Sequence, residues 1–173
     1  MIISLAGYMG SGKSHISKLL SDKTGLPLLD LDKEITLRQG MSVAEIFEKK
    51  GEIFFRKQER LVLESILNEQ KTSLVLSLGG GTPAYFDNMK LIREKTRSFF
   101  LQASITTLCE RLLRVQNKRP LVARIPAEDL PEFIAKHLFE RNAFYSQCEY
   151  TINTNAKDPE EITTEILSRL DLL

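Results

Sequence analysis

One short segment limits the folds open to this chain more than any other. Residues 7–14 read Gly-Tyr-Met-Gly-Ser-Gly-Lys-Ser, which matches the GxxxxGK[ST] pattern of a phosphate-binding loop. An apolar run over residues 2–6 comes directly before the loop, and a helical pattern follows it and ends at Gly25. Strand, loop and helix in this order are the context that the motif requires. The sequence therefore predicts that the chain binds a nucleoside triphosphate.

Each loop residue suits one part of a metal-bound polyphosphate. Gly7, Gly10 and Gly12 let the backbone curl tightly and present several amides to one anion. The helix that begins near Lys13 adds its unpaired N–H groups and the positive end of its dipole. Lys13 supplies a charge for the β- and γ-phosphates, and the Ser14 hydroxyl suits a hydrated Mg²⁺. A glycine-rich turn that contains a lysine by chance would not explain this agreement.

The composition indicates a single globular domain. The 173 residues, 42% of them apolar, suffice for a hydrophobic core and make a second full domain unexpected. Lys plus Arg number 24 against 23 for Asp plus Glu, so the net charge favours neither nucleic acid nor a membrane surface as partner. No signal peptide or membrane-length run is visible. We therefore expect a cytoplasmic protein in which Cys109 and Cys148 are reduced thiols.

Apolar runs with β character alternate with helical stretches along the chain. The runs lie at about residues 2–6, 26–30, 73–78, 98–102 and 150–153. This alternation predicts an α/β fold, a three-layer α/β/α sandwich with a five-stranded parallel sheet. Two helix starts are well marked, one by Ser42 with Glu45 and one by Asp158 with Pro159 and Glu161. The last helix carries an apolar face that suits docking on the sheet: Ile162, Ile166 and Leu170.

Residues 115–127 differ from their surroundings. They contain two prolines and three basic residues and show no clean periodicity. A basic irregular segment between two helices of a nucleotide-binding protein indicates a mobile lid, which we place at about residues 114–127. A merely solvated loop remains the alternative.

The acid that orients the metal in many phosphate-loop proteins is missing from its usual place. The strand at residues 73–78 ends in glycines instead of an Asp. Asp30 and Asp32 are the best substitutes, because residues two apart on a strand point to the same side. One carboxylate can serve the metal through water and the other a substrate hydroxyl. Alternatively, Asp32 is only the N-cap of a helix that starts near Lys33.

The interpretation of three further features depends on which residues lie near them in the folded chain. Gly79, Gly80 and Gly81 follow a buried strand, and they suggest a surface where a ligand lies against bare backbone. Arg56 and Arg141 taken singly read as solvated helix charges, but together they can form a clamp for a carboxylate. Their spacing does not show that they meet. His15 has no metal-ligand partner at helical spacing, so solvated helix surface is expected for it.

Six motifs in order resemble the shikimate kinase family. They are GYMGSGKS, DLD at 30–32, GEIFFRKQE at 51–59, SLGGGTP at 77–83, RPL at 119–121 and ERNAFY at 140–145. The phosphate loop is shared by many families, whereas the combination with the later motifs is much more specific. The resemblance extends from the first strand to the final helix. It implies a P-loop NTPase with a nucleoside monophosphate kinase-like fold and a substrate-binding region at about residues 31–61.

The resemblance also implies an activity and the roles of the acceptor-site residues. The family transfers the γ-phosphoryl group of ATP to the 3-hydroxyl of shikimate, with Mg²⁺, toward chorismate and the aromatic amino acids. By motif, Asp32 binds the accepting hydroxyl, either as a base or only to position it. Arg56 and Arg141 hold the carboxylate, and Gly79, Gly80 and Gly81 line the ring. Lys13 and Arg119 stabilise the transferred phosphoryl group.

The same resemblance assigns the metal and the nucleotide. Ser14 binds Mg²⁺, with Asp30 and Ser77 acting through metal-bound water. For adenine we select Arg114 and Pro159, with Arg111 close enough to remain an alternative. The residues assigned to the nucleotide are Gly10, Ser11, Gly12, Lys13, Ser14, His15, Arg114, Arg119 and Pro159. Two departures from the family pattern, Leu31 and Val122, remove none of these side chains.

Two other classes of function compete with this interpretation. One is another small-molecule kinase, such as a gluconate kinase or a nucleoside monophosphate kinase. The other is a nucleotide-binding module without catalysis, which would be expected to lack Lys13, Asp32 or Arg119. A monomer that acts on ATP and shikimate is the expectation.

Overall fold

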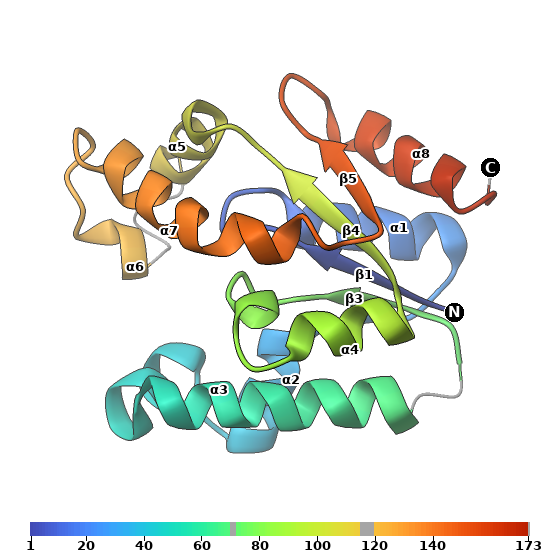
Figure 1. The fold of residues 1–173 in the computed structure, drawn as a ribbon, viewed down its shortest axis with the longest axis horizontal. Coiled ribbons are helices and arrows are strands. Elements are labelled where there is room, and N and C mark those ends of the chain that lie inside the picture. Colours follow the sequence, from blue (N-terminus) through green and yellow to red (C-terminus); the bar gives the residue numbers. More distant parts are fainter. Residues whose placement is uncertain (70–71, 115–119, 173) are drawn as a thin grey trace.

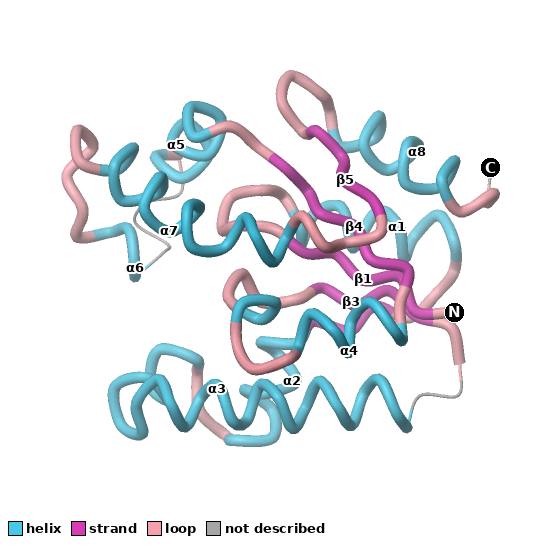
Figure 2. Tube along the Cα trace, in the orientation of Figure 1, coloured by secondary structure: helices cyan, strands magenta, loops and turns pink. Residues whose placement is uncertain are grey.

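A parallel sheet forms the centre of the molecule. The structure, a computed structural model, describes residues 1–69, 72–114 and 120–172. The sheet has the order β2-β3-β1-β4-β5, and all its strand pairs are parallel. Its strands are β1 (Ile2–Ala6), β2 (Leu28–Asp30), β3 (Leu74–Ser77), β4 (Arg97–Gln102) and β5 (Tyr150–Asn153). The prediction of a five-stranded parallel sheet is confirmed, and Figure 2 shows the strands in magenta, enclosed by helices.

Helices cover both faces of the sheet, which confirms the three-layer sandwich. On one face, α1 (Lys13–Thr24) and α8 (Pro159–Arg169) pack on Ile3 and Leu5 of the fully buried β1. On the other face lie α3 (Val43–Glu69), α4 (Asn88–Lys95), α5 (Ile105–Leu113) and α7 (Leu130–Tyr145). Figure 1 shows α4 between α7 and α3. The strands β1, β3 and β4 are buried over most of their length, which explains why they read as largely apolar runs in the sequence.

The predicted helix starts are present. The Glu45 carboxylate accepts from the Ser42 N–H at 2.9 Å, and the Glu45 N–H donates to Ser42 Oγ at 3.2 Å. Asp158 and Glu161 form the same reciprocal pair at the start of α8. These caps satisfy N–H groups that the helix itself leaves unpaired.

Two helices that pack against each other carry Asp32 and Arg56, which the sequence predicts as substrate-binding residues. The helix α3 is divided at Gly51, whose φ of 81° and ψ of 169° are not helical, and its longer C-terminal part carries Arg56. The short helix α2 (Leu31–Gln39) packs against α3. After β3, the glycine segment leads into a 3-10 turn, η1 (Thr82–Ala84). Within the described residues, each helix is too short or too polar to cross a bilayer.

The segment expected as a lid is only partly described. Residues 115–119, including Arg119, lie outside the described residues. The chain then forms α6 (Pro120–Ala123), where Val122 is fully buried, and Ile125 packs against the same core. The described part of this segment is therefore partly helical and anchored to the core, rather than irregular throughout as the sequence had indicated.

Candidate active site

The phosphate loop connects β1 to α1 at the carboxyl edge of the sheet. Gly7 has a φ of 149°, and a Cβ there would lie 2.7 Å from Ser11 Oγ and 2.9 Å from the Leu101 carbonyl oxygen. The position therefore excludes any side chain. Lys13 folds back over the loop, where its Nζ donates to the Gly7 and Tyr8 carbonyls at 2.6 and 3.1 Å. Its ammonium thus lies close to the backbone that would surround a polyphosphate.

A cleft of about 600 Å³ opens beside the loop, between α1, α5 and the segment before α8. Arg111 and Arg114 both line it, so the structure brings together the residues weighed for adenine. Arg111 is already anchored, since its Nη2 donates to the Thr154 carbonyl at 3.0 Å and its Nη1 to the Gly10 carbonyl at 3.4 Å. Of the residues predicted for the nucleotide, the lining includes Ser11, Gly12, His15, Arg114 and Pro159. His15 is both exposed, as expected, and part of this cleft.

The geometry predicted for the two acids is wrong. The strand β2 ends at Asp30, and Asp32 lies in the first turn of α2, so the carboxylates do not alternate along a strand. The alternative is also wrong, because the N-cap is Asp30, which accepts from the Lys33 N–H at 3.2 Å. The Asp32 side chain still reaches the glycine segment: a Cβ on Gly79 would lie 2.9 Å from Asp32 Oδ1.

Asp32 has an unusual electrostatic environment. Burial, together with the nearby charges of Asp30 and Glu59, raises the pKa of its carboxyl from 3.8 to about 6, although Lys13 and Arg56 act in the opposite direction. A carboxyl with such a pKa is ionised near neutral pH and binds a proton readily when the pH falls. It therefore suits contact with a hydroxyl that loses a proton.

The donors near the loop fit a magnesium ion. In the sheet register Asp30 lies opposite Ser77, and Ser14 is in the first turn of α1. Carboxylate and hydroxyl oxygens are the hard donors that Mg²⁺ takes. In the described part of the chain, no three His, Cys, Asp or Glu residues are placed to hold a metal. These residues thus fit an ion held mostly by water and phosphate oxygens, as is usual for Mg²⁺ with nucleotides.

Arg56 is buried, contrary to its interpretation as a solvated helix charge. Its Nη1 donates to Glu59 at 2.9 Å, and its Nε and Nη2 both lie 3.3 Å from Glu52 Oε1. The Tyr85 ring lies under the guanidinium, 4.0 Å from centroid to Cζ. Glu59 is fully buried and also accepts from Thr82 Oγ1 at 2.6 Å. These contacts fix the guanidinium in one place beside the glycine segment.

Neighbouring side chains of the fold leave no room for a Cβ at two positions of the glycine segment. A Cβ on Gly81 would lie 2.6 Å from Arg56 Nη2, and the Cβ position of Gly79 is crowded by Asp32 and Thr82, each at 2.9 Å. At Gly80, by contrast, an added Cβ meets only ordinary contacts of 3.6 Å or more. The proposal that a ligand needs bare backbone therefore concerns Gly80, whereas side chains of the fold already require glycine at its two neighbours.

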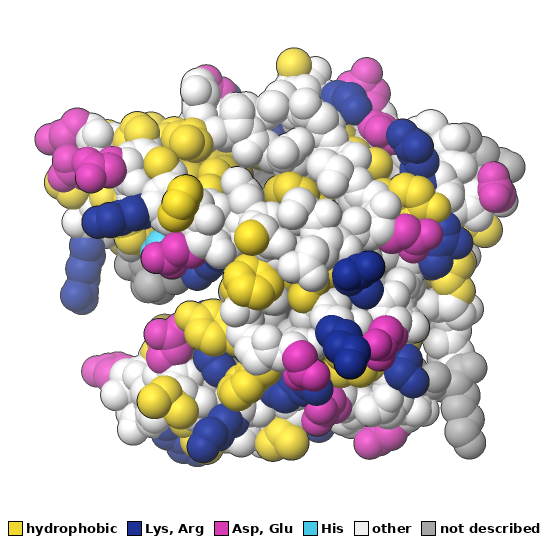
Figure 3. Space-filling model, in the orientation of Figure 1, with side chains coloured by type: hydrophobic (Ala, Val, Ile, Leu, Met, Phe, Trp, Pro, Cys, Tyr) yellow, Lys and Arg dark blue, Asp and Glu magenta, His cyan; other side chains and the backbone are white. Residues whose placement is uncertain are grey.

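Arg56 and Arg141 converge on this segment, which their spacing alone did not show. Arg141 Nη1 lies 4.0 Å from the Cβ position of Gly80. Tyr145, one turn further along α7, donates to the Gly80 carbonyl. Both arginines act electrostatically on Tyr145 and on Glu52. Figure 3 shows the surface hollowed between α7 and α3, with basic side chains in dark blue at its margin.

Sequence reasoning missed several residues of this site. Glu52 and Glu59 were part of a quoted motif but received no role, and neither did Thr82 or Tyr85. The two glutamates had a usable signal, because they lie four residues before and three residues after Arg56 on one helix. For Thr82 and Tyr85 no spacing rule applies, since only the fold brings them to α3.

A phosphate loop after the first strand, the sheet order and two arginines that converge on the glycine segment are typical of a P-loop small-molecule kinase. Comparison with known proteins narrows this class. The family model for shikimate kinase matches residues 9–171. A shikimate kinase of Flavobacterium psychrophilum is 48% identical over 165 residues, 95% of each chain. The chain belongs to the shikimate kinase family, which is a family of ATP-dependent phosphotransferases.

Solved structures agree with this assignment. A shikimate kinase from Bacteroides thetaiotaomicron superposes with a TM-score of 0.93 at 32% identity, covering 99% of both chains. The shikimate kinase from Acinetobacter baumannii, solved in complex with shikimate, has a TM-score of 0.86 at 30% identity and covers 98% of this chain and 92% of the other. The family match decides against a gluconate or nucleoside monophosphate kinase.

Proposed function

We propose that the chain transfers the γ-phosphoryl group of ATP to the 3-hydroxyl of shikimate, giving 3-phosphoshikimate and ADP, as a cytoplasmic monomer. The observation that carries the acceptor assignment is the convergence of Arg56 and Arg141 on the glycine segment, next to Asp32. Two guanidinium groups at one end of a small site match a carboxylate. The nearby carboxyl of Asp32, with its raised pKa, matches a hydroxyl.

In this proposal Arg56 and Arg141 hold the substrate carboxylate, and Gly79–Gly81 line the ring. Asp32 contacts the accepting hydroxyl and orients it toward the phosphate loop. With a pKa of about 6, Asp32 is ionised at neutral pH and able to accept the hydroxyl proton. The Acinetobacter baumannii relative, described in complex with shikimate, supports the choice of ligand.

Lys13 and Arg119 stabilise the charge of the transferred phosphoryl group, and the loop amides of Gly10, Ser11 and Gly12 hold the phosphates. Since phosphoryl transfer asks for little covalent chemistry from the protein, these cations matter more to the rate than the basicity of Asp32. Arg119 lies outside the described residues, so its part rests on the motif. The lid at about residues 114–127 would bring it to the site and exclude water.

Ser14 and Asp30 would hold Mg²⁺, Asp30 through water and next to Ser77. When bound, the ion supplies positive charge between the β- and γ-phosphates. For the adenine base we favour Arg114 and Pro159. Both Arg114 and Pro159 line the cleft beside the phosphate loop, which supports this choice.

The direct test is an assay of acceptor-dependent ADP release by the purified protein with ATP and Mg²⁺. Shikimate should stimulate release strongly, and gluconate and nucleoside monophosphates should not. Turnover that is independent of shikimate would overturn the proposed acceptor. Nucleotide binding without any turnover would instead favour a silent binding module.

A further inference from the structure

One face of α7 carries a row of side chains with four-residue spacing. Phe133, His137, Arg141 and Tyr145 follow one another at this interval, which places them on the same side of a helix. The Phe133 ring meets the His137 ring edge-on at 4.4 Å. Tyr145, at the end of the row, donates to the Gly80 carbonyl. Arg141 is thus flanked on its own helix by two aromatic groups that other contacts hold in place.

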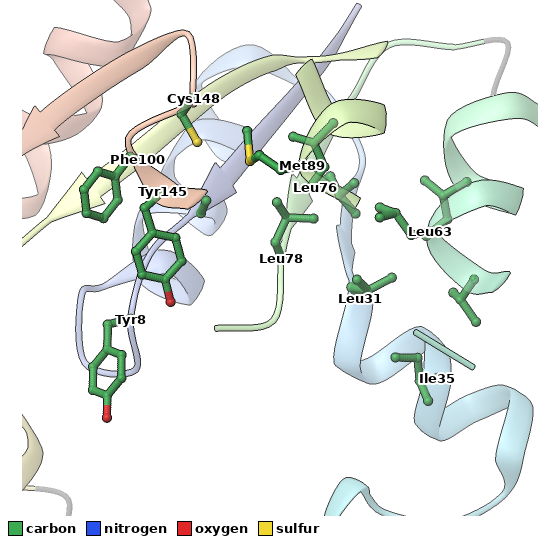
Figure 4. Close-up of a cluster of buried hydrophobic side chains, with 14 of the residues drawn as sticks. Tyr8, Leu31, Ile35, Leu63, Leu76, Leu78, Met89, Phe100, Tyr145 and Cys148 are labelled. Atoms are coloured by element: carbon green, nitrogen blue, oxygen red, sulfur yellow. The ribbon is translucent and has the colours of Figure 1, made fainter. Parts of the chain in front are cut away.

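Tyr8 from the phosphate loop meets the middle of this row. Its side chain is 1% exposed, its Oη shares a hydrogen bond of 2.8 Å with His137 Nδ1, and its ring lies 5.6 Å from Arg141 Cζ. Its backbone carbonyl accepts from Lys13 Nζ. Figure 4 shows Tyr8 and Tyr145 close together, with both hydroxyls pointing out of the hydrophobic cluster. Tyr8 therefore connects two parts of the site. Its backbone belongs to the phosphate loop, and its ring lies near Arg141.

These contacts restrict the rotamers that the Arg141 side chain can adopt before a ligand binds. A guanidinium on a long side chain loses rotamer freedom when it binds a carboxylate, and a site that has already restricted the side chain reduces this cost. The Tyr8 ring offers a face that attracts a cation. Burial, followed by the charge of Arg141, lowers the pKa of His137, which favours the neutral ring at neutral pH. A neutral ring keeps the hydrogen bond to Tyr8 without a second positive charge beside Arg141.

We propose that Tyr8 and His137 are positioning residues of the acceptor site: their mutual hydrogen bond fixes the Tyr8 ring under Arg141 and holds the guanidinium at Gly80 for the substrate carboxylate. This inference rests on the proposed function, in which Arg141 binds that carboxylate. It gives the first variable residue of the phosphate loop a part in acceptor binding, separate from the phosphate contacts of the loop backbone.

The first test is Tyr8→Phe, which removes the hydroxyl and keeps the ring. Loss of one neutral hydrogen bond predicts a rise in the KM for shikimate of about three- to tenfold, with the KM for ATP unchanged. The matched control is Tyr150→Phe in the edge strand β5, which also removes one tyrosine hydroxyl. This hydroxyl accepts from Arg97 of β4, so both KM values should stay unchanged. His137→Leu should resemble Tyr8→Phe, and His137→Asn, which keeps a hydrogen-bonding atom near Nδ1, should restore much of the loss.

The second test uses an Arg141→Ala background. If Tyr8 acts through Arg141, Tyr8→Phe adds no further rise in the KM for shikimate there. An equal rise in both backgrounds, or a rise in the KM for ATP alone, would overturn the positioning role. So would an unchanged KM in Tyr8→Phe when Arg141→Ala itself binds shikimate poorly. A normal KM for shikimate in Arg141→Ala would have a different meaning, because it would remove the carboxylate clamp of the proposed function and this inference with it.

Discussion

Replacing Asp32 by Asn should make the protein more stable and less active. The substitution keeps the size of the side chain and removes a negative charge that the folded state disfavours. Asp32 is largely buried, and two other carboxylates, those of Asp30 and Glu59, act on it. Lys13 and Arg56 offset only part of this, because the pKa of Asp32 remains at about 6 instead of 3.8. The ionised carboxylate is therefore present at neutral pH at a cost to folding.

The size of this cost follows from the pKa shift. A rise from 3.8 to about 6 is worth about 3 kcal/mol of unfolding free energy, at roughly 1.4 kcal/mol per pH unit. We expect Asp32→Asn to be more stable than the parent by up to about this amount above pH 7. In a chain of 173 residues this corresponds to a rise in Tm of roughly 6–12 °C. Shikimate-dependent turnover should fall at the same time, because the Asn amide cannot accept a proton from the hydroxyl that the proposed function places beside residue 32.

The pH dependence gives the sign of the effect. Well below pH 3.8 Asp32 is protonated in the folded and the unfolded chain, so the two proteins should have equal stability. As the pH rises from 3.8 to about 6, the unfolded chain ionises while the folded chain still holds its proton, and the parent loses stability relative to the variant. Above this window the difference is complete and constant.

Urea unfolding of both proteins between pH 4 and pH 8 measures this difference. Asp22→Asn on the exposed side of α1 removes the same charge at the surface and should change stability by less than about 0.5 kcal/mol at any pH. The reasoning would be refuted if Asp32→Asn were no more stable than the parent at pH 8. A stability gain of equal size at pH 4 would refute it as well, since it could not come from the charge.

Three further predictions concern the same site. Arg56→Ala and Arg141→Ala should each raise the KM for shikimate by about 10- to 100-fold, the loss expected for a hydrogen bond to a charged group, and steady-state kinetics with normal values for both would contradict the clamp. Gly81→Ala should lower the Tm clearly, because its Cβ would lie 2.6 Å from Arg56 Nη2, whereas Gly80→Ala should unfold near the parent temperature and affect mainly shikimate binding. Thermal unfolding separates the two, and equal losses of Tm would show that the crowding argument is wrong. Lys13→Met should reduce turnover by at least about 100-fold with an unchanged circular dichroism spectrum, and turnover within tenfold of the parent would exclude the proposed charge stabilisation.

The parts of the structure that sequence reasoning predicted well depend on neighbours along the chain. The phosphate loop is defined by a run of eight consecutive residues, and the helix starts at Ser42 and Asp158 by partners three residues away. The strand pattern was also reliable, because β1 and β3 are buried on both faces and read as largely apolar runs, with Ser4 and Ser77 as the exceptions. In each case the residues that form the pattern are close together in the sequence, and they also form the structural feature that the pattern predicts.

The acids show where this reasoning fails. Period-two spacing placed Asp30 and Asp32 on one strand, but β2 has only three residues and the helix begins at Leu31. Leu31 is fully buried, and its burial within the first turn of α2 places Asp32 beside Gly79. A short strand followed at once by a helix leaves too few residues for either periodicity to be recognised.

Arg56 and Glu59 show why the contacts of the site could not be predicted from the separate motifs, since each residue also contacts a side chain that lies far away in the sequence. A buried ion pair is weak support for stability, because the desolvation of both charges offsets their attraction. Here the pair lies next to Asp32, so Glu59 anchors Arg56 and, at the same time, raises the pKa of Asp32. The same carboxylate also fixes Thr82 behind Gly79. Features that lower the free energy of unfolding are common at functional sites. The stability gain expected for Asp32→Asn would measure the size of this effect at Asp32.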